Sequence, residues 1–104
     1  SQNDAERFAE ALAAVFTEAR EQAGLSQKKL AEISGVGRTG IVTFEAGDRN
    51  ISMLLCKMLA DGIGQPLADL VEKADNELKK ETSELPAGGS LTPANEAKAF
   101  LRPL

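Results

Sequence analysis

Two short patterns in the chain have the spacing of known chemical sites. Residues 35–40 read Gly-Val-Gly-Arg-Thr-Gly, the spacing of glycine-rich loops that hold the phosphates of a dinucleotide. Such a loop follows a strand of a parallel sheet, whereas the residues before Gly35 have the apolar spacing of a helix. Ser26 and Lys29 have the spacing of the catalytic pair of penicillin-recognising enzymes, but the companion motifs of those enzymes are absent. We therefore interpret both patterns as parts of short helices and turns.

The residue types that carry metal and acid–base chemistry are scarce. The chain has no His, which is the commonest general base and metal ligand, and Cys56 is its single cysteine. One cysteine forms no internal disulfide, and no closely spaced set of ligands resembles a zinc site. We therefore expect a protein of a reducing compartment, the cytoplasm, that is not an enzyme and uses no metal or cofactor.

Length and charge narrow the function classes further. The 104 residues suffice for one modest hydrophobic core, and no apolar run reaches the roughly 20 residues of a membrane span. The net charge of −4 argues against a surface that is positive all over. However, residues 25–50 carry four basic and three acidic side chains, whereas residues 1–24 carry two basic and five acidic ones. The positive charge is thus concentrated in the second quarter of the chain.

Apolar residues recur at steps of three and four, and Gly or Pro separates these segments, so we expect an all-α fold. The expected helices, with their capping residues, span residues 3–24, 26–35, 37–47, 52–64 and 66–84. Ser26 and Ser52 are suitable N-caps, and Gly24, Gly35 and Gly64 suit left-handed helix ends. The expected inward residues of the three middle helices are Leu30, Ala31, Ile33, Ile41, Phe44, Leu54, Leu55, Met58 and Leu59.

A series of residues at fixed spacing extends from the first expected helix to the fifth. The series is Arg20, Gly24-Leu25-Ser26-Gln27, Leu30-Ala31, Gly35-Val36, Ile41, Glu45-Ala46-Gly47, Leu59-Ala60 and Gly64. It resembles the lambda-repressor-like (Xre/Cro) helix-turn-helix family over about residues 12–71. The resemblance implies a five-helix DNA-binding domain in residues 1–71 whose third helix enters the major groove. Residues 72–104 are then a helical extension, a linker and a tail with room for one more short helix.

The resemblance also assigns DNA contacts to three places in the chain. Gln27 matches a glutamine at the start of the second helix that binds a phosphate and reaches a base. Arg38 begins the recognition helix, from which a guanidinium can reach guanine, while Arg49 and Asn50 match positions that hold the DNA backbone. The complete expected set is Gln27, Lys28, Gly37, Arg38, Thr39, Val42, Thr43, Arg49 and Asn50. Arg20 and Glu45 match a structural ion pair of the family.

Three positions depart from the family pattern. Gly37 stands where Ser or Thr commonly caps the recognition helix, Gly40 lies inside that helix, and Asp48 replaces a residue that is often basic. Each glycine weakens a helix by roughly 0.5–1 kcal/mol. From these departures we expect either a loosely formed recognition helix with modest affinity for DNA, or a domain that keeps this fold but binds proteins instead.

The sequence therefore leaves two functions open. The first is a sequence-specific transcriptional regulator, a repressor or autoregulator of a bacterium or phage, that binds a double-stranded DNA operator as a homodimer. The alternative is a protein-interaction module or antitoxin whose main partner is a toxin or another protein. The expected dimer interface, by antiparallel pairing or exchange of the tail, comprises Val71, Ala74, Leu78, Leu85, Phe100 and Leu101. A tail with merely scattered apolar residues is the competing interpretation.

Overall fold

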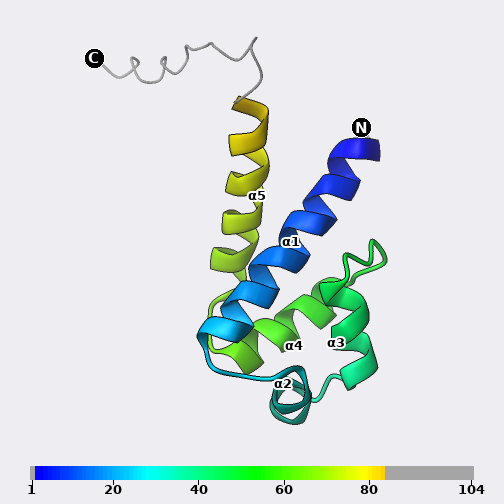
Figure 1. Ribbon diagram of the computed structural model, residues 1–104, viewed down its shortest axis with the longest axis vertical. Coiled ribbons are helices and arrows are strands. Elements are labelled where there is room, and N and C mark those ends of the chain that lie inside the picture. The colour runs from blue at the N-terminus through cyan, green and yellow to red at the C-terminus, as the bar shows by residue number, and fades with distance from the viewer. Residues whose placement is uncertain (1, 84–104) are drawn as a thin grey trace, which may run out of the picture.

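The computed structural model describes residues 2–83, which form five helices and no strand (Figure 1). The helices are α1 (Gln2–Gln22), α2 (Gln27–Ser34), α3 (Arg38–Glu45), α4 (Met53–Ile63) and α5 (Leu67–Ser83). This confirms the expected all-α, five-helix class. The further helix of the tail and the interface residues Leu85, Phe100 and Leu101 lie outside the described residues. No helix within residues 2–83 is long and apolar enough to cross a membrane.

Local side-chain and glycine signals set most of the helix ends. The hydroxyl of Ser26 accepts a hydrogen bond from the Lys29 amide at 2.9 Å, and that of Ser52 accepts one from the Leu55 amide at 3.0 Å. Gly35 ends α2 with a φ of +82°, in the left-handed region that favours glycine. Asn3, the first residue of the range 3–24, was expected as the N-cap of the first helix, but α1 already begins at Gln2, so that expectation is wrong.

The core lies between α1 and the four other helices. Phe16 of α1 and Phe44 of α3 meet edge to face, with ring centroids 5.1 Å apart and an interplanar angle of 82°. Such aromatic pairs contribute roughly 0.5–1.5 kcal/mol beyond the area that they bury. The other buried residues of this cluster are Leu12, Val15, Ala19, Leu30, Val36, Ile41, Cys56, Leu59, Ala60, Ile63, Leu70 and Ala74. The packing thus fixes α3 directly against α1.

Two residues expected in the core are exposed. Ile33 is 51% exposed and Leu54 is 69% exposed. In α2, Ser34 lies four residues after Leu30 and therefore on the same side of the helix, facing α4. A Cβ built on Gly62 of α4 would lie 3.0 Å from the Cβ of Ser34. In α4 the buried positions are Cys56, Leu59, Ala60 and Ile63, so Leu54 falls on the opposite side of the helix. A helix carrying apolar residues on both sides does not reveal from sequence which side is buried.

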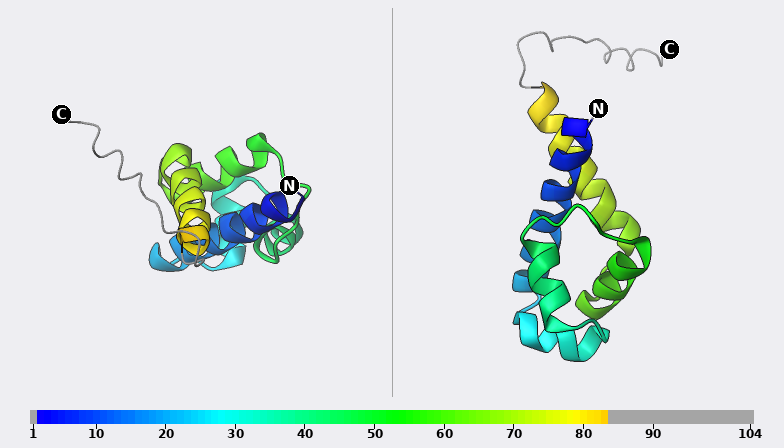
Figure 2. Two further views of the ribbon diagram at one scale, coloured as in Figure 1. Left: turned by 90° about the horizontal axis from the view of Figure 1, so that it is seen from above. Right: turned by 90° about the vertical axis from the view of Figure 1, so that its right-hand side faces the viewer.

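The structure also corrects one residue of the expected dimer interface. Ala74 is fully buried within a single chain, because α5 packs against α1 where the two helices cross (Figure 2). Ala74 is therefore not available to a second copy, whereas Val71 and Leu78 remain partly exposed.

Candidate nucleic-acid interface

The turn between α2 and α3 contains most of the glycine-rich pattern. Gly35 reverses the chain with its positive φ, and the Val36 amide donates to the Ser34 hydroxyl at 3.1 Å. Val36 is buried, and Gly37 is the N-cap that precedes α3. The pattern is thus a helix-to-helix turn, and the strand that a dinucleotide site needs is absent from residues 2–83. The two helices and their turn occupy one end of the molecule (Figure 1).

The third helix has one buried and one exposed face. Ile41 and Phe44 are 0% and 2% exposed and hold the helix on the core. The remaining positions at the helix start and on its outer side are exposed: Arg38, Thr39, Gly40, Val42 and Thr43. The exposed face therefore offers a guanidinium, two hydroxyl groups and the branched apolar side chain of Val42, which are groups that read base edges in the major groove.

A network around Glu45 connects α1, α2 and α3. Arg20 Nε donates to Glu45 Oε2 at 2.7 Å, and Arg20 Nη2 donates to Glu45 Oε1 at 3.2 Å. The side chains of Arg20 and Glu45 are only 10% and 8% exposed. Arg20 Nη1 also donates to the Leu25 carbonyl at 2.7 Å, so each of the three guanidinium nitrogens donates a hydrogen bond within the chain. This is the contact that the family resemblance implies for Arg20 and Glu45.

The same carboxylate holds Gln27, a contact that the sequence did not indicate. Gln27 Nε2 donates to Glu45 Oε1 at 2.9 Å, and the residue is half-buried. The amide group is thus oriented by the end of α3, while the next residue, Lys28, is exposed at the start of α2. Residues 18 positions apart share this hydrogen bond, which is why no local pattern predicts it.

Two contacts that were not predicted from the sequence hold the loop after α3. Arg49 Nη1 lies 2.5 Å from Glu6 Oε2 of α1, with both side chains partly exposed to solvent. The Asp48 carboxylate accepts a hydrogen bond from the Asn50 amide at 3.0 Å. Asp commonly binds the backbone amide two residues on in this way, so Asp48 was a recognisable turn signal. Asp48 shapes the loop that carries Arg49 and Asn50.

The exposed cations differ in how firmly they are paired within the chain. Arg38 forms no ion pair with any residue that the structure describes, whereas Lys29 lies 3.7 Å from Glu32 and Arg49 pairs with Glu6. Surface pairs of this kind contribute about 0–1 kcal/mol, so an approaching phosphate can replace the partner of either side chain. Arg38 is the cation most directly available at the start of α3.

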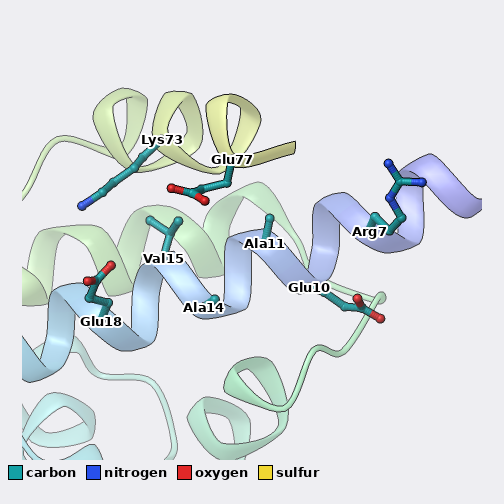
Figure 3. Close-up of a pocket in the computed structure, with 8 residues that line it drawn as sticks. All are labelled: Arg7, Glu10, Ala11, Ala14, Val15, Glu18, Lys73 and Glu77. Atoms are coloured by element: carbon teal, nitrogen blue, oxygen red, sulfur yellow. The ribbon is translucent and has the colours of Figure 1, made fainter. Parts of the chain in front are cut away.

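A separate groove between α1 and α5 does not belong to this surface. Its volume is about 350 Å³, and it is lined by Arg7, Glu10, Ala11, Ala14, Val15, Glu18, Lys73 and Glu77. Figure 3 shows Lys73 and Glu77 projecting from α5 above the apolar side of α1, with Glu18 on α1 nearby. Its lining carries three carboxylates, of Glu10, Glu18 and Glu77, against the two cations of Arg7 and Lys73, and this net negative charge disfavours phosphate.

The comparison with protein families agrees with this arrangement. No curated protein matches the sequence. Residues 17–70 match the family described as helix-turn-helix, and this range covers half of the chain, from the last turns of α1 to the start of α5. It includes the Arg20–Glu45 pair, the α2–α3 turn and the exposed face of α3. The chain belongs to the lambda-repressor-like helix-turn-helix family of DNA-binding domains.

Proposed function

We propose that the chain is a sequence-specific transcriptional regulator, a repressor or autoregulator encoded by a bacterium or phage, that binds a DNA operator in the cytoplasm. The observation that carries this proposal is the exposed face of α3, which the buried Ile41, Phe44 and Glu45 hold outward. A rigidly held polar face of this kind is what base readout in the major groove requires.

The contacts divide by chemistry into base readout and backbone binding. Arg38 reads a guanine through O6 and N7, while Val42 and the hydroxyl groups of Thr39 and Thr43 contact neighbouring base edges. The space beside Gly37 is open, since a Cβ built there would meet no other atom of the chain within 4 Å, and without a side chain the DNA can approach the start of α3 closely. Gln27, Lys28, Arg49 and Asn50 bind phosphates and fix the register of α3 in the groove.

A second copy completes the site on DNA. One α3 reads only a few base pairs, so we propose a two-fold homodimer with recognition helices about 34–36 Å apart. Val71 and Leu78 remain candidates for its interface because both are partly exposed on α5. The expected mass is that of two chains by light scattering at the concentration where DNA is bound.

The test of the proposal is binding to DNA at two salt concentrations. A selection from random DNA should first identify a preferred sequence. The affinity for mixed duplexes, measured by fluorescence anisotropy, should fall steeply between about 50 and 200 mM salt, because binding to phosphates releases the counterions of the DNA. Little binding at either concentration would contradict the proposal. The protein-interaction alternative would then be favoured, since Met53 and Leu54 expose 70% and 69% of their surface.

A pair of arginine variants separates the two kinds of contact. Arg38→Ala should relax the preference at one or two operator positions and cost roughly 1–3 kcal/mol on the best site. Arg49→Ala should weaken all sequences alike and reduce the salt slope by about one unit. Identical sequence profiles for the two variants would show that Arg38 does not read a base.

A further inference from the structure

The loop after α3 lies against the first half of α1, and an ion pair joins the two segments. Arg49 Nη1 is 2.5 Å from Glu6 Oε2, and the two side chains are 64% and 36% exposed. One turn further along α1, the Glu10 side chain also reaches the loop, since its Cγ would lie 3.8 Å from a Cβ built on Gly47. Figures 1 and 2 show the loop beside this part of α1. The cation proposed to bind the DNA backbone is therefore paired with a carboxylate of its own chain.

Pairing distinguishes the two arginines of the proposed DNA surface. Arg38, at the start of α3, forms no ion pair with any residue that the structure describes, whereas Arg49 is held by Glu6. Asp48, the neighbour of Arg49 in the chain, has a separate role, because its carboxylate accepts a hydrogen bond from the Asn50 amide at 3.0 Å. Base readout by Arg38 thus breaks no ion pair, whereas backbone binding by Arg49 disturbs one.

Glu6 and a DNA phosphate need the same chemical group of Arg49. Carboxylate and phosphate oxygens both accept charge-assisted hydrogen bonds from the edges of a guanidinium. A phosphate that binds the edge facing Glu6 must displace the carboxylate. A phosphate that binds another edge brings a second anion close to Glu6, and like charges at short range repel each other. Either arrangement weakens the contact between Arg49 and DNA.

We propose that Glu6 competes with DNA phosphate for Arg49 and so lowers the affinity of the chain for DNA. The inference rests on the proposed function, because it needs a DNA backbone within reach of the loop. Phosphates are the same in every sequence, so the effect is equal on the operator and on other DNA. Glu6 thus sets how strongly the chain binds DNA, while Arg38 decides which sequence it prefers. Weaker binding shortens the time that a regulator spends on the large excess of unrelated sites in a genome.

The test compares two glutamine variants of the full chain by fluorescence anisotropy, with the selected operator and a scrambled duplex. Glu6→Gln keeps the size of the side chain and removes the carboxylate that Arg49 binds. Because ion pairs this exposed are weak, the affinity for both duplexes should rise only about two- to fivefold. Glu10→Gln removes the same charge one turn along α1, beside the same loop, and should have a clearly smaller effect. Circular dichroism should show both variants folded, since neither side chain is buried.

The same substitutions in an Arg49→Ala background separate competition from the general effect of charge. Without Arg49, Glu6→Gln should change the affinity no more than Glu10→Gln does. Equal gains for the two glutamine variants, or a Glu6→Gln gain that persists without Arg49, would overturn the proposal, because Glu6 would then act only as a negative charge. Weaker binding by Glu6→Gln would also overturn it, because Glu6 would then hold Arg49 in place for phosphate.

A failure of this inference and a failure of the proposed function give different results. If the wild type and every variant leave both duplexes unbound, the proposed function is wrong and the inference falls with it. If the wild type binds the operator but Glu6→Gln and Glu10→Gln behave alike, only the inference is wrong. Binding that appears in Glu6→Gln but not in Glu10→Gln would support both.

Discussion

The two helices of the helix-turn-helix motif have the same length but are stabilised in different ways. Both α2 and α3 contain eight residues. α2 has a side-chain cap from Ser26, a left-handed glycine at its end, and a contact with α4 so close that a Cβ on Gly62 would lie 2.9 Å from Leu30 Cδ1. α3 follows the N-cap Gly37, which provides no side-chain hydrogen bond, and it contains Gly40.

The difference shows that α3 depends on long-range contacts where α2 has local signals. Ile41, Phe44 and Glu45 attach α3 to the core and to α1. The surface proposed to read DNA is therefore carried by the helix with the weaker intrinsic preference. Changes to the anchors of α3 should have large effects on stability, and changes to its glycines should have small ones.

The largest expected effect is the loss of the Glu45 anchor. Glu45→Ala leaves the Arg20 guanidinium without its partner in a site where it is 10% exposed. Breaking a buried pair in this way costs about 3–5 kcal/mol, which lowers the melting temperature by more than ~10 °C for a domain of this size. Thermal unfolding followed by circular dichroism measures the change.

Glu10→Ala is the matched control, because Glu10 is an exposed glutamate of α1. It should change the melting temperature little, since surface substitutions usually alter stability by less than about 0.5 kcal/mol. Equal shifts for Glu45→Ala and Glu10→Ala would show that the Arg20 pair is not an anchor of α3.

The same contrast explains which parts of the structure could be predicted from the sequence. The ends of α2 and α4 follow from Ser26, Ser52, Gly35 and Gly64, because capping groups act within a few residues. The outer face of α3 follows from the spacing of Ile41 and the family pattern. These features depend on residues that are close together in the chain or that recur at fixed spacing.

The contacts that were not predicted join distant residues or depend on the rotation of a helix. Glu45 of α3 binds Gln27 of α2, and Glu6 of α1 binds Arg49 in the loop after α3. No single sequence records such pairing. Leu54 was expected inside because it is apolar, but the core uses the side of α4 that carries Cys56. Only the packing of α4 against α1 and α2 decides between these two sides.

The next prediction concerns the close packing of α2. Gly62→Ala should lower stability by about 1–3 kcal/mol, because the new methyl group would meet Leu30 Cδ1 at 2.9 Å and Ser34 Cβ at 3.0 Å. The better helix preference of Ala offsets roughly 1 kcal/mol of this strain. Urea unfolding should show a lower midpoint with an unchanged slope. A rise in the midpoint would show that α2 moves away at little cost.

The same substitution in α3 should have the opposite sign. Gly40→Ala places a methyl group 3.5 Å from Val36 Cγ1, an ordinary van der Waals contact. The free energy of unfolding should rise by about 1 kcal/mol, because Ala is the better residue inside a helix. Measured together by urea unfolding, the Gly62 and Gly40 variants test whether space or helix preference decides each site. A loss of stability for both would contradict the distinction between α2 and α3.

The smallest expected effect is the addition of a cap to α3. Gly37 has φ −60° and ψ 146°, which any residue can adopt, and a Cβ there meets nothing within 4 Å. In Gly37→Ser the hydroxyl can accept a hydrogen bond from the amide of Gly40, three residues on, as Ser26 and Ser52 accept from theirs. Serine at an N-cap is more favourable than glycine by a few tenths of a kcal/mol. Replacing glycine also reduces the conformational freedom of the unfolded chain, so the free energy of unfolding should rise by about 0.5 kcal/mol in total.

Gly37→Ala isolates the hydrogen bond in that prediction. Alanine restricts the unfolded chain as serine does but offers no acceptor to the Gly40 amide, so Gly37→Ser should be more stable than Gly37→Ala by about 1 kcal/mol. The two variants are compared by urea unfolding without DNA, since Gly37 also belongs to the proposed DNA contact. Equal stabilities would mean that the start of α3 gains nothing from a cap and that Ile41 and Phe44 alone determine where the helix begins.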